Sequence, residues 1–141
     1  MSIAREAALR IQKRYRLARP IQETDLDRVL HTLGFRVVEI PVSLPVLEFT
    51  WGHTIGIRAD QSPRSRLWLK AHALGHCLLH VGDQTTLDNW WLRHQERQAE
   101  EFAGWLLIGH IKVAAEPWDL ADYYDVPQER VQYWLQLVET W

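Results

Sequence analysis

Two histidines stand four residues apart in the stretch KAHALGHCLLH, which covers residues 70–80. His72 and His76 have the spacing of the metal-binding half of the motif H-E-x-x-H, in which the glutamate is a general base. Ala73 occupies the position of that glutamate. On a helix of about 100° per residue, the two imidazoles lie about 40° apart and project from one face. The sequence therefore keeps a frame for metal and lacks the group that would activate water.

A third metal ligand is expected on the next acidic segment, RHQERQAEEFAGWLL. A catalytic zinc takes three protein ligands and leaves one position for water. A third histidine six residues after His76 would fall at Gly82, so that arrangement fails. We expect Glu96 to bind the metal. Glu100, one turn further on the same face, is expected to accept an imidazole N–H and fix its tautomer.

The other histidines and the single cysteine are given lesser roles. His80, one turn beyond His76, is expected to support the ligands or to line the pocket. His94 and His110 are expected at the surface or in packing, and Cys77 in the core rather than as a ligand or nucleophile. Each pair alone has a simpler explanation, because glutamate pairs are usually a solvated helix face and two histidines four apart are weak evidence of metal. The combination is what indicates a site.

The elements that must position these residues are mostly helices. Apolar residues recur every three or four positions between turn signals, which is the helical period. Helices are expected over residues 3–18, 24–34, 62–81 and 91–108, with two more over 113–141. In the histidine-bearing helix, the side opposite the histidines carries Leu67, Ala71, Leu74, Leu78 and Val81 and should face the core. Gly75 costs about 1 kcal/mol in a helix interior and should let another backbone approach closely.

Three short strands are expected between the second and third helices, in FRVVEIPV, LEFTW and HTIGIRA. Pro41 and Pro45 suggest that the first is short or lies at a sheet edge. The order of helices, strands and helices predicts an α+β fold with a small, mainly antiparallel three-stranded sheet packed with helices. The final helices, which meet at DVPQE, are similar to a helix-turn-helix.

Length and composition predict one soluble domain. The chain has 141 residues and a net charge of −2, so it has no strong attraction to nucleic acid or membrane. We expect a core over residues 1–112 and a helical extension over 113–141. A single cysteine fits a reducing compartment, and no segment has the apolar length of a signal peptide or a bilayer span. A cytoplasmic location is expected.

The two blocks together resemble the ImmA/IrrE family of zinc metallopeptidases, over roughly residues 25–135. That family shows R-x-x-x-A-H-E-L-G-H-x-x-x-H and then E-x-x-A-x-x-F-A-x-x-L-L. The first block is matched by Ala71, His72, Leu74, Gly75, His76 and His80, with Arg66 one residue before the position of the arginine, and the second by Glu96, Ala99, Phe102, Ala103, Leu106 and Leu107. The family usually continues L-L-x-P, where this chain has Gly109. The serious departure is Ala73.

The resemblance implies a zinc-dependent endopeptidase that cleaves a helix-turn-helix repressor or another regulatory protein and so affects transcription. Ala73 implies that this chain is inactive, because general-base catalysis contributes about 10²–10⁴-fold and alanine cannot take a proton. The substitution leaves metal binding possible, since the glutamate is not a ligand. An altered active enzyme and a natural pseudoenzyme both fit. The rival function is a zinc-bearing module that binds a repressor without cutting it.

DNA binding through the last two helices is a third hypothesis, and charge argues against it. Residues 113–141 carry one basic residue, Arg130, and the six acids Glu116, Asp119, Asp122, Asp125, Glu129 and Glu139. Phosphates would be repelled by such a surface. The aromatic residues there suit a packed cap or a protein interface better. The basic segment over residues 5–19 is a weaker candidate for nucleic acid and is usually a solvated face.

Overall fold

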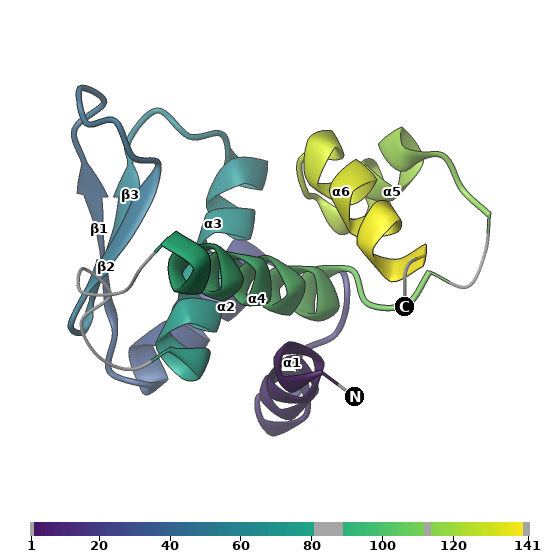
Figure 1. The fold of residues 1–141 in the computed structure, drawn as a ribbon, viewed down its shortest axis with the longest axis horizontal. Coiled ribbons are helices and arrows are strands. Elements are labelled where there is room, and N and C mark those ends of the chain that lie inside the picture. The colour runs from purple at the N-terminus through teal and green to yellow at the C-terminus, as the bar shows by residue number, and fades with distance from the viewer. Residues whose placement is uncertain (1, 81–88, 112–113, 140–141) are drawn as a thin grey trace.

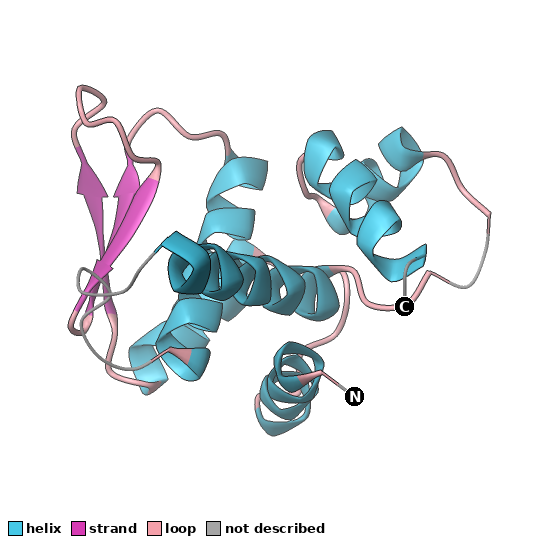
Figure 2. Cartoon of the chain, viewed as in Figure 1, coloured by secondary structure: helices cyan, strands magenta, loops and turns pink. Residues whose placement is uncertain are grey.

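The computed structural model describes residues 2–80, 89–111 and 114–139. Within these ranges it contains six helices and one three-stranded sheet, which confirms the expected α+β class (Figures 1 and 2). The elements are α1 (Ile3–Arg14), α2 (Glu23–Thr32), β1 (Arg36–Ile40), β2 (Glu48–Trp51), β3 (Thr54–Arg58), α3 (Pro63–Leu79), α4 (Asn89–Leu107), α5 (Pro117–Tyr124) and α6 (Gln128–Glu139). The end of the predicted third helix at Val81 and the polar loop over 82–88 lie outside the described residues.

The sheet is mixed rather than mainly antiparallel. Its strand order is β1-β3-β2, with β2 antiparallel and β1 parallel to β3. The two residues 52–53 turn β2 directly into β3, while residues 41–47 carry the chain from β1 to the far edge of the sheet. β2 therefore runs back, and β3 returns between the two in the direction of β1. Both β1 and β2 are edge strands, as Pro41 and Pro45 indicated for β1.

Helix boundaries follow local capping chemistry. Ser62 accepts a hydrogen bond from the backbone N–H of Ser65 and opens α3, as predicted. α2 begins at Glu23 rather than at residue 24, because Gln22 and Asp25 form a capping box. α1 ends at Arg14 rather than at residue 18. Gly34 ends α2 with a φ of 87°, a left-handed conformation that suits glycine.

Helices α3 and α4 cross at the centre of the molecule, with the sheet on one side and α5–α6 on the other (Figure 1). Phe102 of α4 packs on Gly75 of α3, where an added Cβ would lie 3.0 Å from the Phe102 Cβ. The group that approaches Gly75 is thus a side chain and not a backbone. The predicted core residues Phe102, Leu106 and Leu107 are all fully buried. The crossing fixes how α4 presents its acidic side to α3.

The C-terminal pair α5–α6 packs on the far end of α4. Trp134 is 1% exposed, lies against Gly104, and donates a hydrogen bond from Nε1 to the carbonyl oxygen of Gly109 at 3.1 Å. Arg64 of α3 forms ion pairs with the α5 side chain Asp122 and with Asp125 after it, at 2.9 and 3.0 Å. The pair therefore contacts both central helices.

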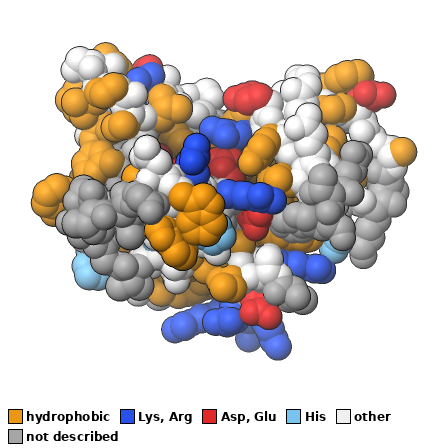
Figure 3. Space-filling view, in the orientation of Figure 1, with side chains coloured by type: hydrophobic (Ala, Val, Ile, Leu, Met, Phe, Trp, Pro, Cys, Tyr) orange, Lys and Arg blue, Asp and Glu red, His pale blue; other side chains and the backbone are white. Residues whose placement is uncertain are grey.

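The basic side chains of the first helix gather on its exposed face, at the lower edge of Figure 3. Arg10, Lys13 and Arg14 of α1 are exposed, as is Arg16 just after the helix. The buried side of α1 carries Ala4, Ala8 and Ile11 and faces the core. No helix in the described ranges has the length and apolar character needed to cross a membrane.

Candidate metal centre

Both motif histidines lie at a buried junction between α3, α4 and β2. His72 is 5% exposed and His76 is 8% exposed. The face that carries them is therefore covered as closely as the apolar face, on which Leu67, Ala71 and Leu74 are buried. Their rings meet edge to face, with centroids 4.7 Å apart. Two imidazoles in such a place need specific polar partners, because burying an unpartnered polar group is costly.

Glu96 of α4 lies opposite both histidines. Its Oε2 is 3.1 Å from His72 Nε2 and its Oε1 is 2.7 Å from His76 Nε2. The carboxylate thus faces the same ring atom of each histidine. The structure therefore brings together the three residues that the sequence predicts as ligands. His72 and His76 come from one turn of α3, and Glu96 comes from the first half of α4.

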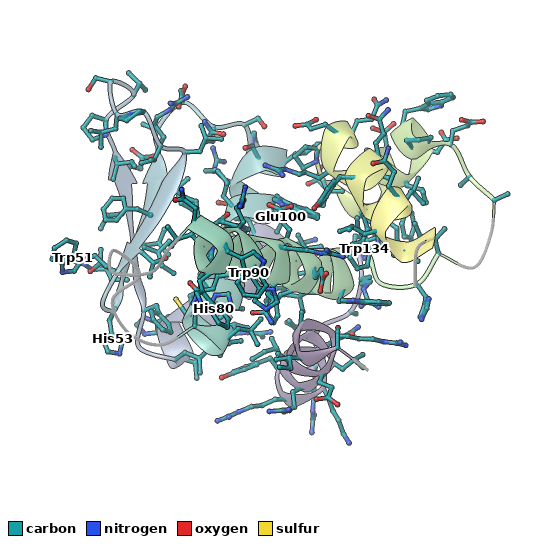
Figure 4. The ribbon with its side chains drawn as sticks, in the orientation of Figure 1. Trp51, His53, His80, Trp90, Glu100 and Trp134 are labelled. Atoms are coloured by element: carbon teal, nitrogen blue, oxygen red, sulfur yellow. The ribbon has the colours of Figure 1, made fainter. Side chains whose placement is uncertain are left out.

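The other ring nitrogens have partners of their own. His72 Nδ1 lies 2.5 Å from Glu48 Oε1 on strand β2. His76 Nδ1 lies 3.0 Å from His80 Nδ1, and His80 Nε2 lies 2.8 Å from Gln98 Oε1 on α4. Figure 4 shows His80 near the C-terminal end of α3, below α4. Both sides of each imidazole are therefore occupied by protein groups.

The acids around His72 dominate its titration. Burial alone would lower the pKa of His72, but the carboxylates of Glu48 and Glu96 raise it to about 10. Burial alone would raise the pKa of Glu96, but the contacts with His72 and His76 hold it far below its ordinary value. Burial lowers the pKa of His80. Without metal, a proton on His72 is what balances the negative charge of this cluster.

The donor set fits a divalent metal. Among the described residues, His72 Nε2 is buried and has no hydrogen-bond partner, although Glu96 is close by. Imidazole nitrogen and carboxylate oxygen are ligands that zinc accepts. Glu48, His72 and His76 also place one ligand atom each within 4.8 Å of one another. Glu48 contacts Nδ1 of His72, however, which is the nitrogen away from Glu96.

Glu100 lies on the metal side of His72 but further away. Its Oε1 is 3.6 Å from His72 Nε2 and accepts a hydrogen bond from Trp68 Nε1 at 3.4 Å. Its Oε2 is 3.2 Å from a guanidinium nitrogen of Arg130 on α6. Figure 4 shows Glu100 on the side of α4 that faces the C-terminal pair. The predicted contact with an imidazole N–H is made instead by Glu48, at Nδ1.

Ala73 is fully buried, with 0% of its surface exposed. Cys77 is half-buried against the core, and burial raises the pKa of its thiol to about 11, which leaves it protonated and unreactive at neutral pH. His94 is exposed and stacks on Trp90, while His110 lies 3.0 Å from a guanidinium nitrogen of Arg5. These last three residues lie outside the metal-facing cluster.

Sequence reasoning missed two members of the cluster, Glu48 and Gln98. The strand LEFTW pointed the other way for the first of them, because its polar residues alternate with Phe49 and Trp51, which would be expected to face the core. Its apolar residues Phe49 and Trp51 are 37% and 81% exposed, whereas the Glu48 side chain is 11% exposed. In the structure Glu48 is the covered residue of β2, and the three residues after it are exposed. A charged residue on the covered face of a strand needs a buried partner, and His72 is that partner. Gln98 had no comparable signal.

Paired histidines on one helix and a glutamate from the next are the types of ligand that a zinc site uses. Residues 30–136 match the model of the Peptidase M78 family, described as the IrrE N-terminal-like domain, and the chain belongs to this family. The expected resemblance to ImmA/IrrE peptidases is thereby confirmed. No curated protein and no solved structure matches the chain.

Proposed function

We propose that this chain is a zinc-binding peptidase-family protein whose metal is held by His72, His76 and Glu96. The observation that carries the proposal is the convergence of both Nε2 atoms on one carboxylate, at 3.1 and 2.7 Å. Two imidazoles and one carboxylate leave a fourth position free, which is typical of catalytic zinc. A metal bound there supplies Lewis-acid polarisation of the scissile carbonyl and activation of water.

The substrate class that we propose is a protein, in particular a helix-turn-helix repressor, so that the chain would regulate transcription in the cytoplasm. Membership of a peptidase family supports a protein partner. Trp90 and Trp91, at the start of the helix that carries Glu96, are 58% and 48% exposed and could contact one. Aromatic residues are enriched at protein interfaces. The acidic surface of residues 113–141 disfavours direct nucleic-acid binding.

In this proposal the chain acts as a single domain of core and C-terminal extension. The buried Trp134 and the ion pairs of Arg64 support this, because they join residues 113–141 to the central helices.

As it stands, α3 supplies no general base. Residues 66–80 contain no Asp or Glu, and Ala73 is buried. The same observation favours a second candidate function, a metal-bearing module that binds its partner without cutting it. Both functions use the same metal site, and they differ in the fate of the bound protein.

Metal content of the purified protein tests the site. The chain should hold one zinc per molecule, and His72→Ala and Glu96→Ala should each remove it. Glu101→Ala changes a neighbouring glutamate that pairs with Arg97 and should keep the metal, so it is the control. Unchanged zinc in His72→Ala would reject the ligand assignment.

A further inference from the structure

We infer that Glu48 and the His80–Gln98 pair are positioning groups that fix the tautomers of the two metal-binding histidines. The inference rests on the proposed function and extends it to three residues that do not face the metal. With the Nδ1 hydrogens held in this way, Nε2 is the nitrogen of each histidine that gives its lone pair to a metal beside Glu96.

Glu48 determines the tautomer of His72. An ionised carboxylate can only accept hydrogen bonds, so the 2.5 Å contact requires that His72 Nδ1 carries the hydrogen and donates it to Glu48 Oε1. In the neutral ring, Nε2 is then a bare acceptor. The Glu48 side chain is 11% exposed, so water competes little for this contact.

Gln98 determines the tautomer of His76 through His80. The carbonyl oxygen of Gln98 accepts, so His80 Nε2 donates to it over 2.8 Å. Neutral His80 has one donor, and its Nδ1 must therefore accept from His76 Nδ1 over 3.0 Å. That leaves His76 Nε2 as an acceptor as well, facing Glu96 Oε1 at 2.7 Å. The direction of each bond follows from the one before it.

Three acceptors consequently converge at one point, two ring nitrogens and one carboxylate. With both rings neutral, no member of this group can donate to another, so the group requires a cation, which is a proton in the metal-free protein and a metal ion when one is bound. Groups that hold the far nitrogen of a metal-binding histidine fix its orientation, and their loss typically costs 10–100-fold in metal affinity. Glu48 reaches the site from the sheet and Gln98 from α4, so two different elements would hold the two histidines.

The experiment on the sheet side compares Glu48→Ala, Glu48→Gln and Glu39→Ala, with zinc affinity measured by competition against a chelator. Glu48→Ala should weaken zinc binding by about 10–100-fold. Glu48→Gln keeps an oxygen that can accept from Nδ1 and nearly the same shape, so it should recover most of the affinity. Glu39 is an exposed glutamate on β1 and its replacement should change nothing. Equal affinities in all three variants would overturn the role of Glu48.

The experiment on the helix side uses Gln98→Leu, Gln98→Glu and Gln95→Leu. Gln98→Leu should weaken zinc binding toward the lower end of the same range of about 10–100-fold, and Gln98→Glu should restore it because a carboxylate also accepts from His80. Gln95 is half-buried on the same helix, and its Oε1 has no partner in the described ranges, so its replacement is the matched control. A loss as large in Gln95→Leu as in Gln98→Leu would indicate general damage to α4 and overturn the relay.

Nitrogen-15 NMR of the zinc-loaded protein reads the tautomers directly. Both His72 and His76 should bind zinc through Nε2 and keep a slowly exchanging hydrogen on Nδ1. Exchange should accelerate at His72 in Glu48→Ala and at His76 in Gln98→Leu. Coordination through Nδ1 at either residue would refute the inference while leaving metal binding intact. Absence of zinc from the unaltered chain would instead refute the proposed function.

Discussion

Helix α3 carries two buried polar clusters on opposite faces, and they differ in how their charges are balanced. Lys70, 7% exposed, lies 2.8 Å from Glu23 and 2.5 Å from Asp27 on α2. His72, 5% exposed, lies among the carboxylates of Glu48 and Glu96. Lys70 and His72 are buried to nearly the same extent. The two clusters differ in their balance of hydrogen-bond donors and acceptors.

The lysine cluster is complete as it stands, because an ammonium group is a donor and its two neighbours are acceptors. With both rings neutral, the histidine cluster has a surplus of acceptors, because His72 and His76 donate their Nδ1 hydrogens to Glu48 and His80 and have none left at Nε2. A complete cluster holds α2 against α3. An incomplete one is available to a cation. Donor–acceptor balance, rather than burial or charge count, therefore separates the structural cluster from the functional one.

The largest effect is expected at Ala73, at the edge of the histidine face. Ala73→Glu should raise the rate of metal-dependent cleavage by about 10²–10⁴-fold, because a carboxylate there could take the proton of the attacking water. Zinc content should not change, since residue 73 is not a ligand. The measurement is cleavage of a co-encoded repressor, with casein as a general protein substrate.

Ala73→Gln is the matched control, because it has the same size as glutamate and cannot take the proton. It should keep zinc and remain as slow as the unaltered chain. If Ala73→Glu binds zinc and its partner but still cuts nothing, the non-catalytic binding module is the correct function. Chelator-sensitive cleavage by the unaltered chain would show that another residue supplies the base.

A smaller effect is expected at Glu100, between the metal site and the C-terminal pair. Glu100→Ala should weaken zinc affinity by about 10–100-fold without removing the site, because Glu100 lies 3.6 Å from Nε2 of His72 beside the ligands. Arg130→Ala removes the cation 3.2 Å from Glu100 and should have a weaker effect in the same direction. The measurement is chelator competition. Complete loss of zinc in Glu100→Ala would mean that Glu100 rather than Glu96 is the ligand.

Much of the fold could be predicted because its signals are local. Ser62 and Pro63 mark the start of α3, and Gly34 marks the end of α2, through capping chemistry that the sequence displays. The parallel pairing of β1 with β3 could not be read in the same way. It depends on where the chain over residues 41–47 leads, and nothing in that segment specifies the far edge of the sheet.

The residues of the site also differ in whether local sequence signals could predict them. His72, His76 and Glu96 were predictable because a helical period and a repeated family pattern bring them together. Glu48 lies 24 residues before His72 on a different kind of element, and the contact exists only once β2 is placed over α3. The lysine cluster was also missed. A single Lys in an apolar helix is expected to be exposed, and only the position of α2 beside α3 shows that Lys70 is buried.

The smallest effect on metal is expected from Lys70→Met, which removes the cation of the complete cluster. Zinc affinity should stay within about twofold, because Lys70 lies about 160° around the helix from His72. Folding should suffer instead: hydrogen bonds to charged groups contribute about 1.5–3 kcal/mol, and partial exposure of Asp27, at 47%, places the loss toward the lower end. The free energy of unfolding of the metal-free protein measures it.

The pH dependence of that loss identifies its cause. Burial alone would raise the pKa of Glu23, but hydrogen bonds from Lys70 and Arg66 hold it below the ordinary value of 4.5. A lowered pKa in the folded state stabilises above the unfolded value and stops stabilising as the pH falls through the folded one. The difference between Lys70→Met and the unaltered chain should therefore be full above about pH 4.5 and shrink in more acidic solution. Lys13→Met, on the exposed face of α1, should show no such difference.

A fall in zinc affinity in Lys70→Met as large as that in Glu48→Ala would mean that the two faces of α3 are coupled, and the contrast between a structural and a functional cluster would fail.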